Sequence, residues 1–588
     1  MENTPEFDVI LRKALVVGRY LVCLIIAGVI LISAGVAASA TPGDRLRLIG
    51  KVEDERGKGI KEAEIEILVN GQPIKPIEGK QTLTTDNHGE FLGEYKLAGG
   101  ILTGAQVEVQ AHKPGWQSPS PTVAKLFRIG QDKEGYRLFQ AQQHLTLSRQ
   151  ITPAFWIATL ILVLVYAVIA AELMHRTLAA MLGAALILFI SYTLGTFNKE
   201  YFIISFEDAV RAIDMNVIFL LMGMMMIIGV LKKTGLFQWL ACQSYALARG
   251  KIFLLSGILM IVTAVLSAFL DNVTTMLLLI PVTIEIALTL KINPITLLIP
   301  EVFASNVGGT ATLIGDPPNI MIGSYARLSF GDFVVNLTGI IVICLLATLI
   351  YYIYWYKKAY LTAEVKDVEG TIVELRRQYR ITDRKLLATA LIILVFTIFL
   401  FVIHGMLHME PCIAALTGAI LLLTIARVNI VELLEHDIEW PTLMFFIGLF
   451  IIVAGAEATG LIHVIAEWVA RVSQGSLIMA VLMVLWVSAL ASAFVDNIPF
   501  TATMLPIIAF LNETIPGAES GVLWWSLALG ACLGGNGTMI GASANVVTVG
   551  LAERAGVHIS FLYYLRACFV PMLITIILGT AYLLIFKI

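Results

Sequence analysis

Two short motifs place an aspartate beside an asparagine within long apolar stretches of the chain. SAFLDN ends at Asn272 and SAFVDN ends at Asn497, so the aspartates are Asp271 and Asp496. At membrane depth an ionised carboxylate costs about 2.5–3.5 kcal/mol on insertion scales, so such a group marks a functional site by default. Carboxylate, amide and hydroxyl oxygens suit small hard cations, and a desolvated carboxyl can take up a proton instead. Asp271 and Asp496 are therefore the leading candidates for a site where a cation and a proton compete.

Further oxygen donors lie close to these aspartates along the sequence or in two later glycine-rich segments. The possible sodium ligands are Asp271, Asn272, Asp496 and Asn497. The other candidates for ion or substrate binding are Thr274, Thr275, Asn306, Thr310, Thr312, Asp316, Asn319, Thr501, Asn536, Thr538 and Asn545.

Some of these acids have a structural alternative. Asp271 and Asp496 could each cap the helix that follows, and capping can coexist with ion binding. Asp316 could be a helix cap, a gate residue or a third ion ligand. Glu301 could relay a proton or lie at the membrane interface.

The amino-acid composition indicates that these residues lie in a membrane protein. Of 588 residues, 58% are hydrophobic and 14% are charged, whereas soluble chains carry about 25% charged residues. The formal net charge is −3, so there is no basic surface for nucleic acid. The composition indicates a multi-pass integral protein of the cell membrane, with the lipid bilayer as its surroundings.

The N-terminal quarter differs from the rest. The apolar run 14–36 follows Arg12 and Lys13 and predicts a membrane helix with a cytoplasmic start, although the sequence at 38–40 also resembles a signal-peptidase site. Residues 41–150 hold 29 of the 83 Lys, Arg, Asp and Glu residues, and they read as short strands over 47–52, 63–69 and 107–111. This region resembles the carboxypeptidase-regulatory-like β-sandwich and is expected outside the cytoplasm, with a spacer or stability role as the simplest interpretation.

The remainder of the chain contains an internal duplication. Asp271 and Asp496 are 225 residues apart, and the same offset relates TGL at 234–236 to TGL at 459–461. Downstream, GGTATLIG at 308–315 matches GGNGTMIG at 534–541 with an offset of 226. The matched residues are mostly polar or glycine, so shared apolar bias does not explain the match.

Basic residues predict that the two halves are inverted. Residues 357–385 hold eight Lys and Arg and are expected in the cytoplasm. The segment 251–291 has a lysine at each end and Asp271 near its middle, which predicts a re-entrant hairpin with both ends cytoplasmic. A second hairpin, 476–513, would enter from the opposite face, and each hairpin precedes a helix broken near 306–312 or 534–538.

The resulting layout is an all-α polytopic inverted-repeat fold with an added β-domain. Its parts are an N-terminal helix (1–40), the β-sandwich (41–150), a first repeat (151–357), a cytoplasmic linker (358–385) and a second, inverted repeat (386–588). The predicted spans are 14–36, 154–172, 177–197, 215–231, 294–326, 332–357, 386–404, 411–427, 441–457, 519–551 and 563–586, with interfacial helices near 235–249 and 461–473.

Two segments resemble the signatures of a known family. FLDNVTTMLLLIPVT from Phe269 and ATLIGDPPNIMIG from Ala311 are similar to those of the ArsB/NhaD-type permeases of the ion transporter superfamily, nearest the pink-eyed-dilution branch. The resemblance covers roughly residues 150–588. It implies a homodimer in which a transport domain moves against a scaffold like an elevator.

The function expected from these observations is secondary active transport coupled to sodium or protons, as in a cation/proton antiporter. Arsenite or anion transport, an anion channel, and a tethered binding protein that uses the β-domain remain alternatives. The chain has no nucleotide-binding loop and no nucleophile elbow, so we expect no enzyme. The expected ligand is a small ion or small molecule, and no cofactor other than a bound sodium is implied.

Overall fold

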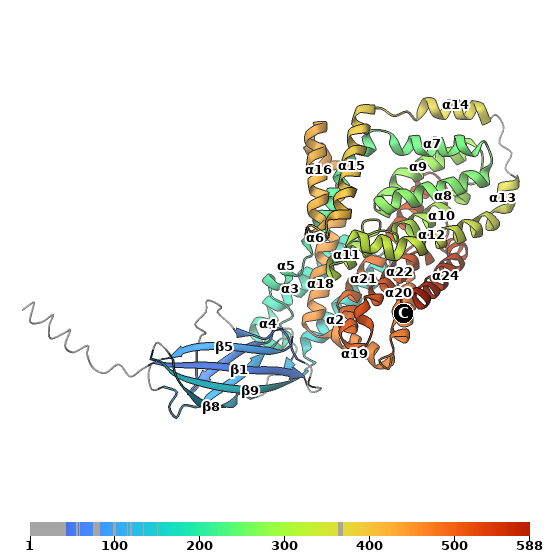
Figure 1. The fold of residues 1–588 in the computed structure, drawn as a ribbon. Coiled ribbons are helices and arrows are strands. Elements are labelled where there is room, and N and C mark those ends of the chain that lie inside the picture. The colour runs from blue at the N-terminus through green and yellow to red at the C-terminus, as the bar shows by residue number, and fades with distance from the viewer. Residues whose placement is uncertain are drawn as a thin grey trace, which may run out of the picture. The chain divides into compact units, whose positions relative to one another are not determined.

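A computed structural model describes residues 43–588 except 55–56, 58, 75–82, 87, 98–100, 114–115, 118–119, 133–134, 150 and 363–367. The predicted first helix at 14–36 lies outside the described residues. The chain divides into two compact units, residues 1–150 and 151–588, and each is described by itself (Figure 1).

The first unit is a sheet of nine strands in which the predicted strands 47–52, 63–69 and 107–111 are present. The strands are β1 (Asp44–Asp54), β2 (Glu64–Val69), β3 (Gln72–Pro73), β4 (Leu83–Thr84), β5 (Glu90–Leu97), β6 (Val107–His112), β7 (Trp116–Gln117), β8 (Thr122–Gln131) and β9 (Arg137–Arg149). Their order is β3-β2-β6-β8-β9-β1-β5, with β4 on β2 and β7 on β9. Alternate residues of β1 are buried, as the period of a strand with one covered face requires.

The sheet is continuous because one strand belongs to two groups. β8 pairs with β6 through residues 122–124 and with β9 through residues 125–131. β1 runs parallel to β9 and antiparallel to β5. The inward side chains, among them Leu46, Val109 and Tyr95, form one hydrophobic core.

The second unit consists of helices. Its first half holds α2 (Pro153–Ala170), α3 (Arg176–Tyr192), α4 (Leu194–Phe197), η1 (Lys199–Tyr201), α5 (Phe206–Arg211), α6 (Met215–Lys233), α7 (Leu236–Ala248), α8 (Ile252–Phe269), α9 (Asn272–Thr289), α10 (Ile295–Gly309), α11 (Pro317–Ala326) and α12 (Phe330–Trp355). α13 (Lys357–Thr362) and α14 (Val368–Gln378) follow in the predicted linker.

The second half is a further series of helices. It holds α15 (Arg384–Ile403), α16 (Pro411–Ala426), α17 (Ile430–His436), α18 (Trp440–Ala458), α19 (Leu461–Val472), α20 (Leu477–Phe494), α21 (Asn497–Thr514), η2 (Ala518–Ser520), α22 (Val522–Gly534), η3 (Gly535–Gly537), α23 (Ser543–Arg554) and α24 (Phe561–Phe586). Each predicted span from residue 154 onward is present as a helix or a broken helix.

Membrane insertion follows from the length and polarity of these helices. Within the described part of the chain, ten helices are long and apolar enough to cross a membrane. Many carry large apolar side chains on their outer surface, such as Phe189, Val335 and Ile392, which are 65%, 78% and 67% exposed. The protein is an integral, multi-pass membrane protein.

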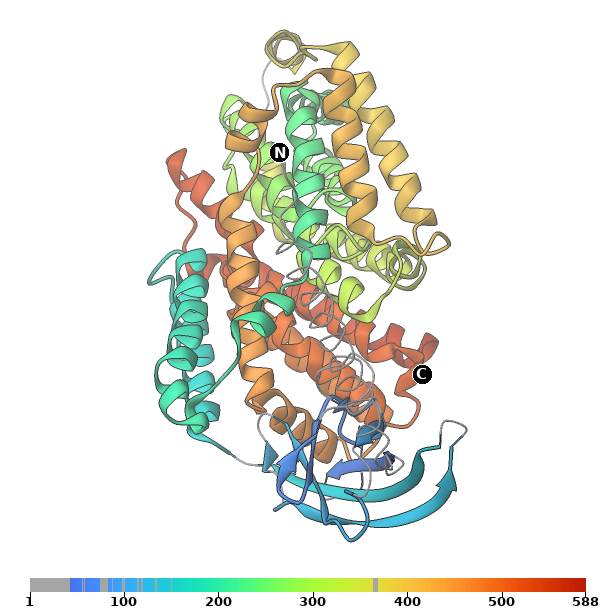
Figure 2. The same cartoon turned by 90° about the vertical axis from the view of Figure 1, so that its left-hand side faces the viewer.

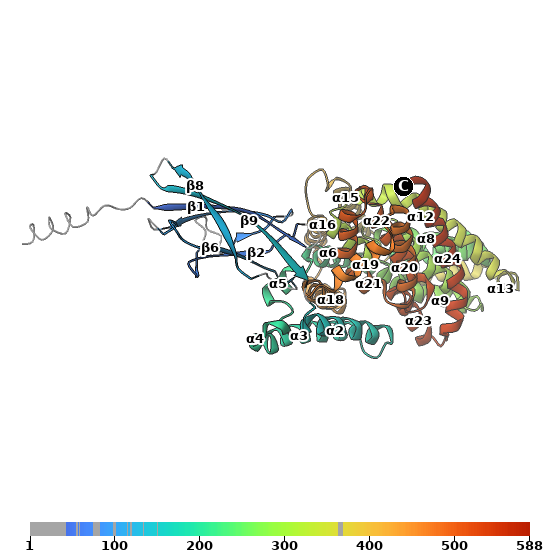
Figure 3. The ribbon, with the colours of Figure 1, turned by 90° about the horizontal axis from the view of Figure 1, so that it is seen from below.

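We distinguish three groups among these helices by their packing. α2 and α3 pack on α18, and α15 and α16 pack on α6; we call these the first and second outer groups (Figures 2 and 3). The first outer group thus takes two helices from the first half of the chain and one from the second, and the second outer group does the opposite. The inner group comprises α8–α11 and α20–α23, in which α10 packs on α8 and α22 packs on α20.

The helix breaks differ in one detail from the prediction. The first break was expected at 306–312, but α10 continues through Gly309 and the non-helical segment is 310–316. Gly308 lies against the backbone of Ala264, so its lack of a side chain serves a close crossing of α10 and α8 rather than the end of the helix. Asn306 therefore lies inside a helix, one turn before the break.

Candidate functional site

The two Asp-Asn motifs each lie between two helices of the inner group. Leu270 and Val495 are extended, and the next helix begins at Asn272 or Asn497. Asp271 Oδ1 accepts a hydrogen bond from the Thr274 backbone N–H (2.9 Å), and Asp496 Oδ1 accepts one from that of Ile498 (3.1 Å). Both aspartates therefore cap helices, and in each the second carboxylate oxygen is free of this role.

A network of amides joins the two halves of the chain at the centre of the inner group. Asn306 Nδ2 donates to Asn545 Oδ1 (2.8 Å) and to Asn536 Oδ1 (3.0 Å). Asn306 Oδ1 accepts a hydrogen bond from Asn272 Nδ2 (3.1 Å). All four side chains are at most 2% exposed, so α9, α10 and the second break are connected away from solvent. Among the residues that the structure describes, Asn536 Nδ2 has no hydrogen-bond partner, which leaves a buried donor for a ligand oxygen in this network.

The network has a partial counterpart on the other side. The 226-residue offset places Cys532 at the position of Asn306 and Asn319 at that of Asn545. Cys532 Sγ lies 3.6 Å from Asn319 Oδ1, so this pair also joins a helix of one half to a helix of the other. The Asn319 amide N–H group donates to the backbone oxygens of Thr310 and Thr312 (3.0 and 2.9 Å), and that of Asn545 does the same for Gly535 and Thr538 (2.8 and 2.9 Å). Asn319 and Asn545 therefore stabilise the backbone of the first and second helix breaks.

Asp316 is bound to the tip of the other half. Its two carboxylate oxygens lie 3.3 and 3.4 Å from Asn497 Nδ2, and its side chain is fully buried. Asp316 makes no capping hydrogen bond to α11, so the cap expected as one of its three roles is wrong. The gate and ion-ligand roles remain predictions.

The candidate threonines bond to nearby backbone oxygens. Thr312 and Thr538, which occupy equivalent positions, donate to the oxygens of Ala268 and Ala493 at the ends of α8 and α20. Thr275, Thr310 and Thr501 each donate to the carbonyl four residues earlier in their own segment. Thr274 contributes its backbone N–H, and its side chain is partly exposed. The hydroxyl protons are thus committed, while the oxygen lone pairs stay available to a cation.

Glu301 lies outside this centre. It is fully buried in α10, where Oε1 accepts a hydrogen bond from Thr263 of α8 (3.2 Å) and Oε2 has no partner. Glu301 is thus buried within the protein, and its proton-relay and interfacial roles both remain predictions.

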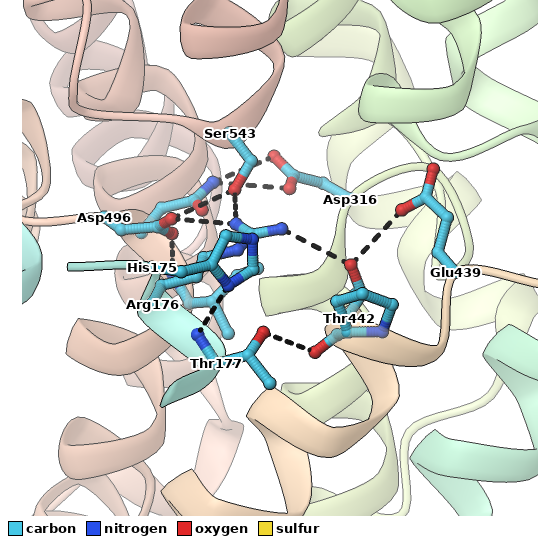
Figure 4. Close-up of polar contacts among 11 residues, drawn as sticks. His175, Arg176, Thr177, Asp316, Glu439, Thr442, Asp496 and Ser543 are labelled. Atoms are coloured by element: carbon cyan, nitrogen blue, oxygen red, sulfur yellow. Dashed lines mark hydrogen bonds and ion pairs between the residues drawn. The ribbon is translucent and has the colours of Figure 1, made fainter. Parts of the chain in front are cut away.

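The structure adds residues that the sequence did not reveal. Arg176, at the start of α3, places Nη1 3.2 Å from Asp496 Oδ2 (Figure 4). The same nitrogen donates to Ser543 Oγ, and Ser543 Oγ donates to Asp496 Oδ2 (3.0 Å). The Arg176 side chain is 22% exposed and that of Asp496 is 10% exposed. A guanidinium from the first outer group therefore occupies the free carboxylate oxygen of Asp496.

A pocket opens beside this contact. It holds about 470 Å³ and is lined by residues 169–176 around the α2–α3 connection, by Asp496, and by residues of the second break and α23. Its wall combines the charges of Arg176 and Asp496 with apolar side chains such as Ile169, Ile540 and Val546. Pockets of this size and mixed polarity hold small molecules or hydrated ions.

The described residues contain no group of three His, Cys, Asp or Glu side chains placed to hold a metal ion. The oxygen donors at the two tips are instead single carboxylates surrounded by amides and hydroxyls. Such a donor set suits a weakly held monovalent cation better than a tightly bound transition metal.

Comparison with known proteins identifies the family. The family model described as CitMHS, citrate transporter, matches residues 166–530, which include both Asp-Asn motifs and the first break. The chain belongs to this family.

Several relatives support the same assignment. An uncharacterized transporter of Mycobacterium tuberculosis is 40% identical over 428 residues, which are 73% of this chain and 97% of the relative. A 46 kDa membrane protein of Mycobacterium leprae is 39% identical over similar shares, 73% and 97%. The human P protein is 36% identical over 77% of this chain and 62% of its own length. The resemblance to the permeases of the ion transporter superfamily is thereby confirmed, and the protein is a membrane transporter.

Proposed function

We propose that this transporter is a secondary active carrier that exchanges a small cation, sodium or a proton, through the site formed by Asp271 and Asp496. The observation that carries the proposal is the convergence of two equivalent Asp-Asn motifs and two helix breaks on one buried polar centre. Each aspartate keeps one carboxylate oxygen free of helix capping. Amide and hydroxyl oxygens stand within a few residues of each carboxylate, as a hard-cation shell requires.

The aspartates lie at the tips of re-entrant hairpins in this proposal. Lys251 precedes α8 and Lys291 follows α9, so the positive-inside rule keeps both ends of this pair in the cytoplasm. α8 and α9 have 18 residues each, so each is long enough to span a bilayer and helix length does not favour a hairpin. The hairpin is supported by the charge pattern alone. The pair α20 and α21 lacks such lysines and enters from the opposite face.

An elevator motion fits the grouping of the helices. The inner group carries every proposed ion ligand, whereas α2, α3 and α18 contact it at a few polar points such as Arg176–Asp496 and the bond from Tyr166 to the Pro499 oxygen (2.7 Å). A body held by few polar contacts can slide past its neighbour at low cost. The homodimer, the position of residues 41–150 outside the cytoplasm and the spacer role of the β-unit stay predictions.

A transport assay tests the proposal. The full chain is reconstituted in liposomes with an internal pH dye, and sodium, lithium, arsenite or citrate is added outside. We expect sodium or lithium to drive a saturable change of internal pH that empty liposomes do not show. An internal pH that does not change when sodium or lithium is added, together with large unitary currents in planar bilayers, would instead identify a channel.

Organic anion transport is the second candidate, because the family model carries the description citrate transporter and Arg176 places a guanidinium on a 470 Å³ pocket. Against it, Asp271, Asp316 and Asp496 contribute three acids to the same region. The same liposomes decide between the two candidates, since labelled citrate uptake that requires a sodium gradient would establish symport with an anion.

A further inference from the structure

We infer that Arg176 competes with a cation for the carboxylate of Asp496. Without a cation, the Arg176–Asp496 ion pair, which we call the latch, holds the inner group to the first outer group. A cation that binds Asp496 breaks this ion pair and releases the inner group. The inference rests on the proposed function, because it requires that a cation bind at Asp496. It goes further by assigning a role to a residue outside the inner group.

The contact has the geometry of a latch. Arg176 starts α3 in the first outer group, and Asp496 and Ser543 belong to the inner group on either side of the second break. One guanidinium nitrogen contacts both of them, and Nη1 lies 3.2 Å from the carboxylate oxygen that does not cap the helix. This oxygen is the one a cation would need, so Arg176 and a cation exclude each other at this point.

The outer group holds Arg176 in place on the other side. Arg176 Nη2 lies 3.4 Å from Thr442 Oγ1 of α18, and its guanidinium stacks 5.3 Å from the centre of the Phe445 ring. Thr177 Oγ1 donates to the Pro441 oxygen (2.7 Å), which ties the start of α3 to the start of α18. The guanidinium is therefore anchored in the outer group and reaches across to the inner one.

Glu439 is a second acid close enough to bind the displaced guanidinium. Thr442 Oγ1 donates to Glu439 Oε2 at 3.2 Å, so Glu439 lies one hydroxyl away from Arg176 (Figure 4). Glu439 belongs to the segment just before α18 and moves with the outer group. When a cation takes Asp496, Arg176 can turn to Glu439, and its charge is not left alone in a low-dielectric site.

The latch couples cation binding at Asp496 to movement of the inner group. With Asp496 empty, the ion pair links the two bodies and opposes movement of the unloaded inner group. With Asp496 occupied, the link is lost and the loaded body can move. Exchange of one cation for another is then favoured over net leak.

Removal of Arg176 and removal of Glu439 should have opposite effects on the apparent cation affinity. A latch closed about 90% of the time lowers this affinity about tenfold, because only the open fraction can bind. Arg176→Gln removes the competitor and should raise the apparent sodium affinity by up to about tenfold. Glu439→Gln removes the alternative partner, favours the closed latch and should lower the affinity. Arg176→Lys keeps the charge but loses the nitrogen that contacts Thr442 and the stacking on Phe445, so its affinity should lie between those of the wild type and Arg176→Gln.

The test uses the purified full chain and sodium chloride titrated against choline chloride. The readout is the shift of the melting temperature, from which an apparent affinity is obtained for each variant. Arg211→Gln is the matched control, because it removes the same charge from an exposed position of α5, where the guanidinium pairs with Glu207 of the same helix. In liposomes, Arg176→Gln should also lower the ratio of sodium–sodium exchange to net sodium efflux.

The outcomes separate the two proposals. Opposite shifts for Arg176→Gln and Glu439→Gln, with Arg211→Gln unchanged, support the latch. A wild type that responds to sodium while Arg176→Gln binds sodium no better overturns the latch and leaves the proposed function intact. A wild type indifferent to sodium and lithium in both assays overturns the proposed cation coupling and the latch together. If Arg176→Gln fails to fold, the Glu439→Gln shift decides.

Discussion

Adding a single methyl group at the crossing of α10 and α8 should disable the transporter. A Cβ built at Gly308 would lie 2.2 Å from the Ala264 oxygen and 2.4 Å from its Cα. At the equivalent crossing of α22 and α20, a Cβ at Gly534 would lie 2.4 Å from the Ala489 oxygen and 2.5 Å from its Cα. The obstructing atoms are backbone, so no side chain can turn away.

The size of the effect follows from these distances. Ordinary contact begins near 3.4 Å, so Gly308→Ala forces α10 and α8 apart by about 1 Å. Overpacking of this kind costs about 1–3 kcal/mol, which exceeds the gain of about 1 kcal/mol from alanine in a helix. Asn306 lies two residues earlier, and its 2.8 and 3.0 Å bonds to Asn545 and Asn536 would be stretched beyond hydrogen-bonding distance.

The assay compares four variants in melting temperature and initial transport rate. Gly308→Ala and Gly534→Ala should melt below the wild type and transport at least about tenfold more slowly, because about 1 Å of misplacement disrupts a preorganised site. Gly339→Ala in α12 and Gly550→Ala in α23 are the controls, since a Cβ at either position meets nothing within 4 Å. If Gly308→Ala were as stable and active as Gly339→Ala, the close crossing would not position the site.

Two further predictions concern the polar centre. Asp271→Asn and Asp496→Asn should each abolish cation-driven pH change in liposomes while the purified variants still fold, and full activity in both would remove the aspartates from the coupling site. Asn306→Ala removes the partner of one polar atom in each of three buried amides, Asn272, Asn536 and Asn545, and should lower the free energy of unfolding by about 1–3 kcal/mol, measured by denaturation in detergent. Asn293→Ala, which removes an exposed hydrogen bond to the Ile295 backbone N–H at the start of α10, should cost less.

Much of the fold could be predicted from the sequence because the residues that match between the two halves of the chain are mostly polar or glycine. The offsets of 225 and 226 align positions such as Thr312 and Thr538, each of which donates to a backbone oxygen at the end of a preceding helix. Apolar length alone predicted the helices, and Asp-Asn in an apolar stretch predicted the helix ends at 270 and 495.

Other features depend on contacts between distant residues. Arg176 is 320 residues from Asp496, and a basic residue at the start of a span is ordinarily explained by membrane orientation alone. The first break was misplaced because Gly308 and Gly309 look like a helix end, whereas in the structure Gly308 lies against the Ala264 backbone of α8 and Gly309 lies against Gly315 of the break. The side-chain pairs Asn306–Asn545 and Asn497–Asp316 join the two halves and leave no local pattern.

The membrane side of each hairpin end tests the central claim most directly. In a background without the six native cysteines, single cysteines are introduced by Lys251→Cys, Lys291→Cys, Ser476→Cys and Glu519→Cys and probed with a membrane-impermeant thiol reagent on either side of the membrane. The account predicts that positions 251 and 291 react from the cytoplasm and that positions 476 and 519 react from the opposite side. Labelling of 251 and 291 from opposite sides, or of all four positions from one side, would contradict it.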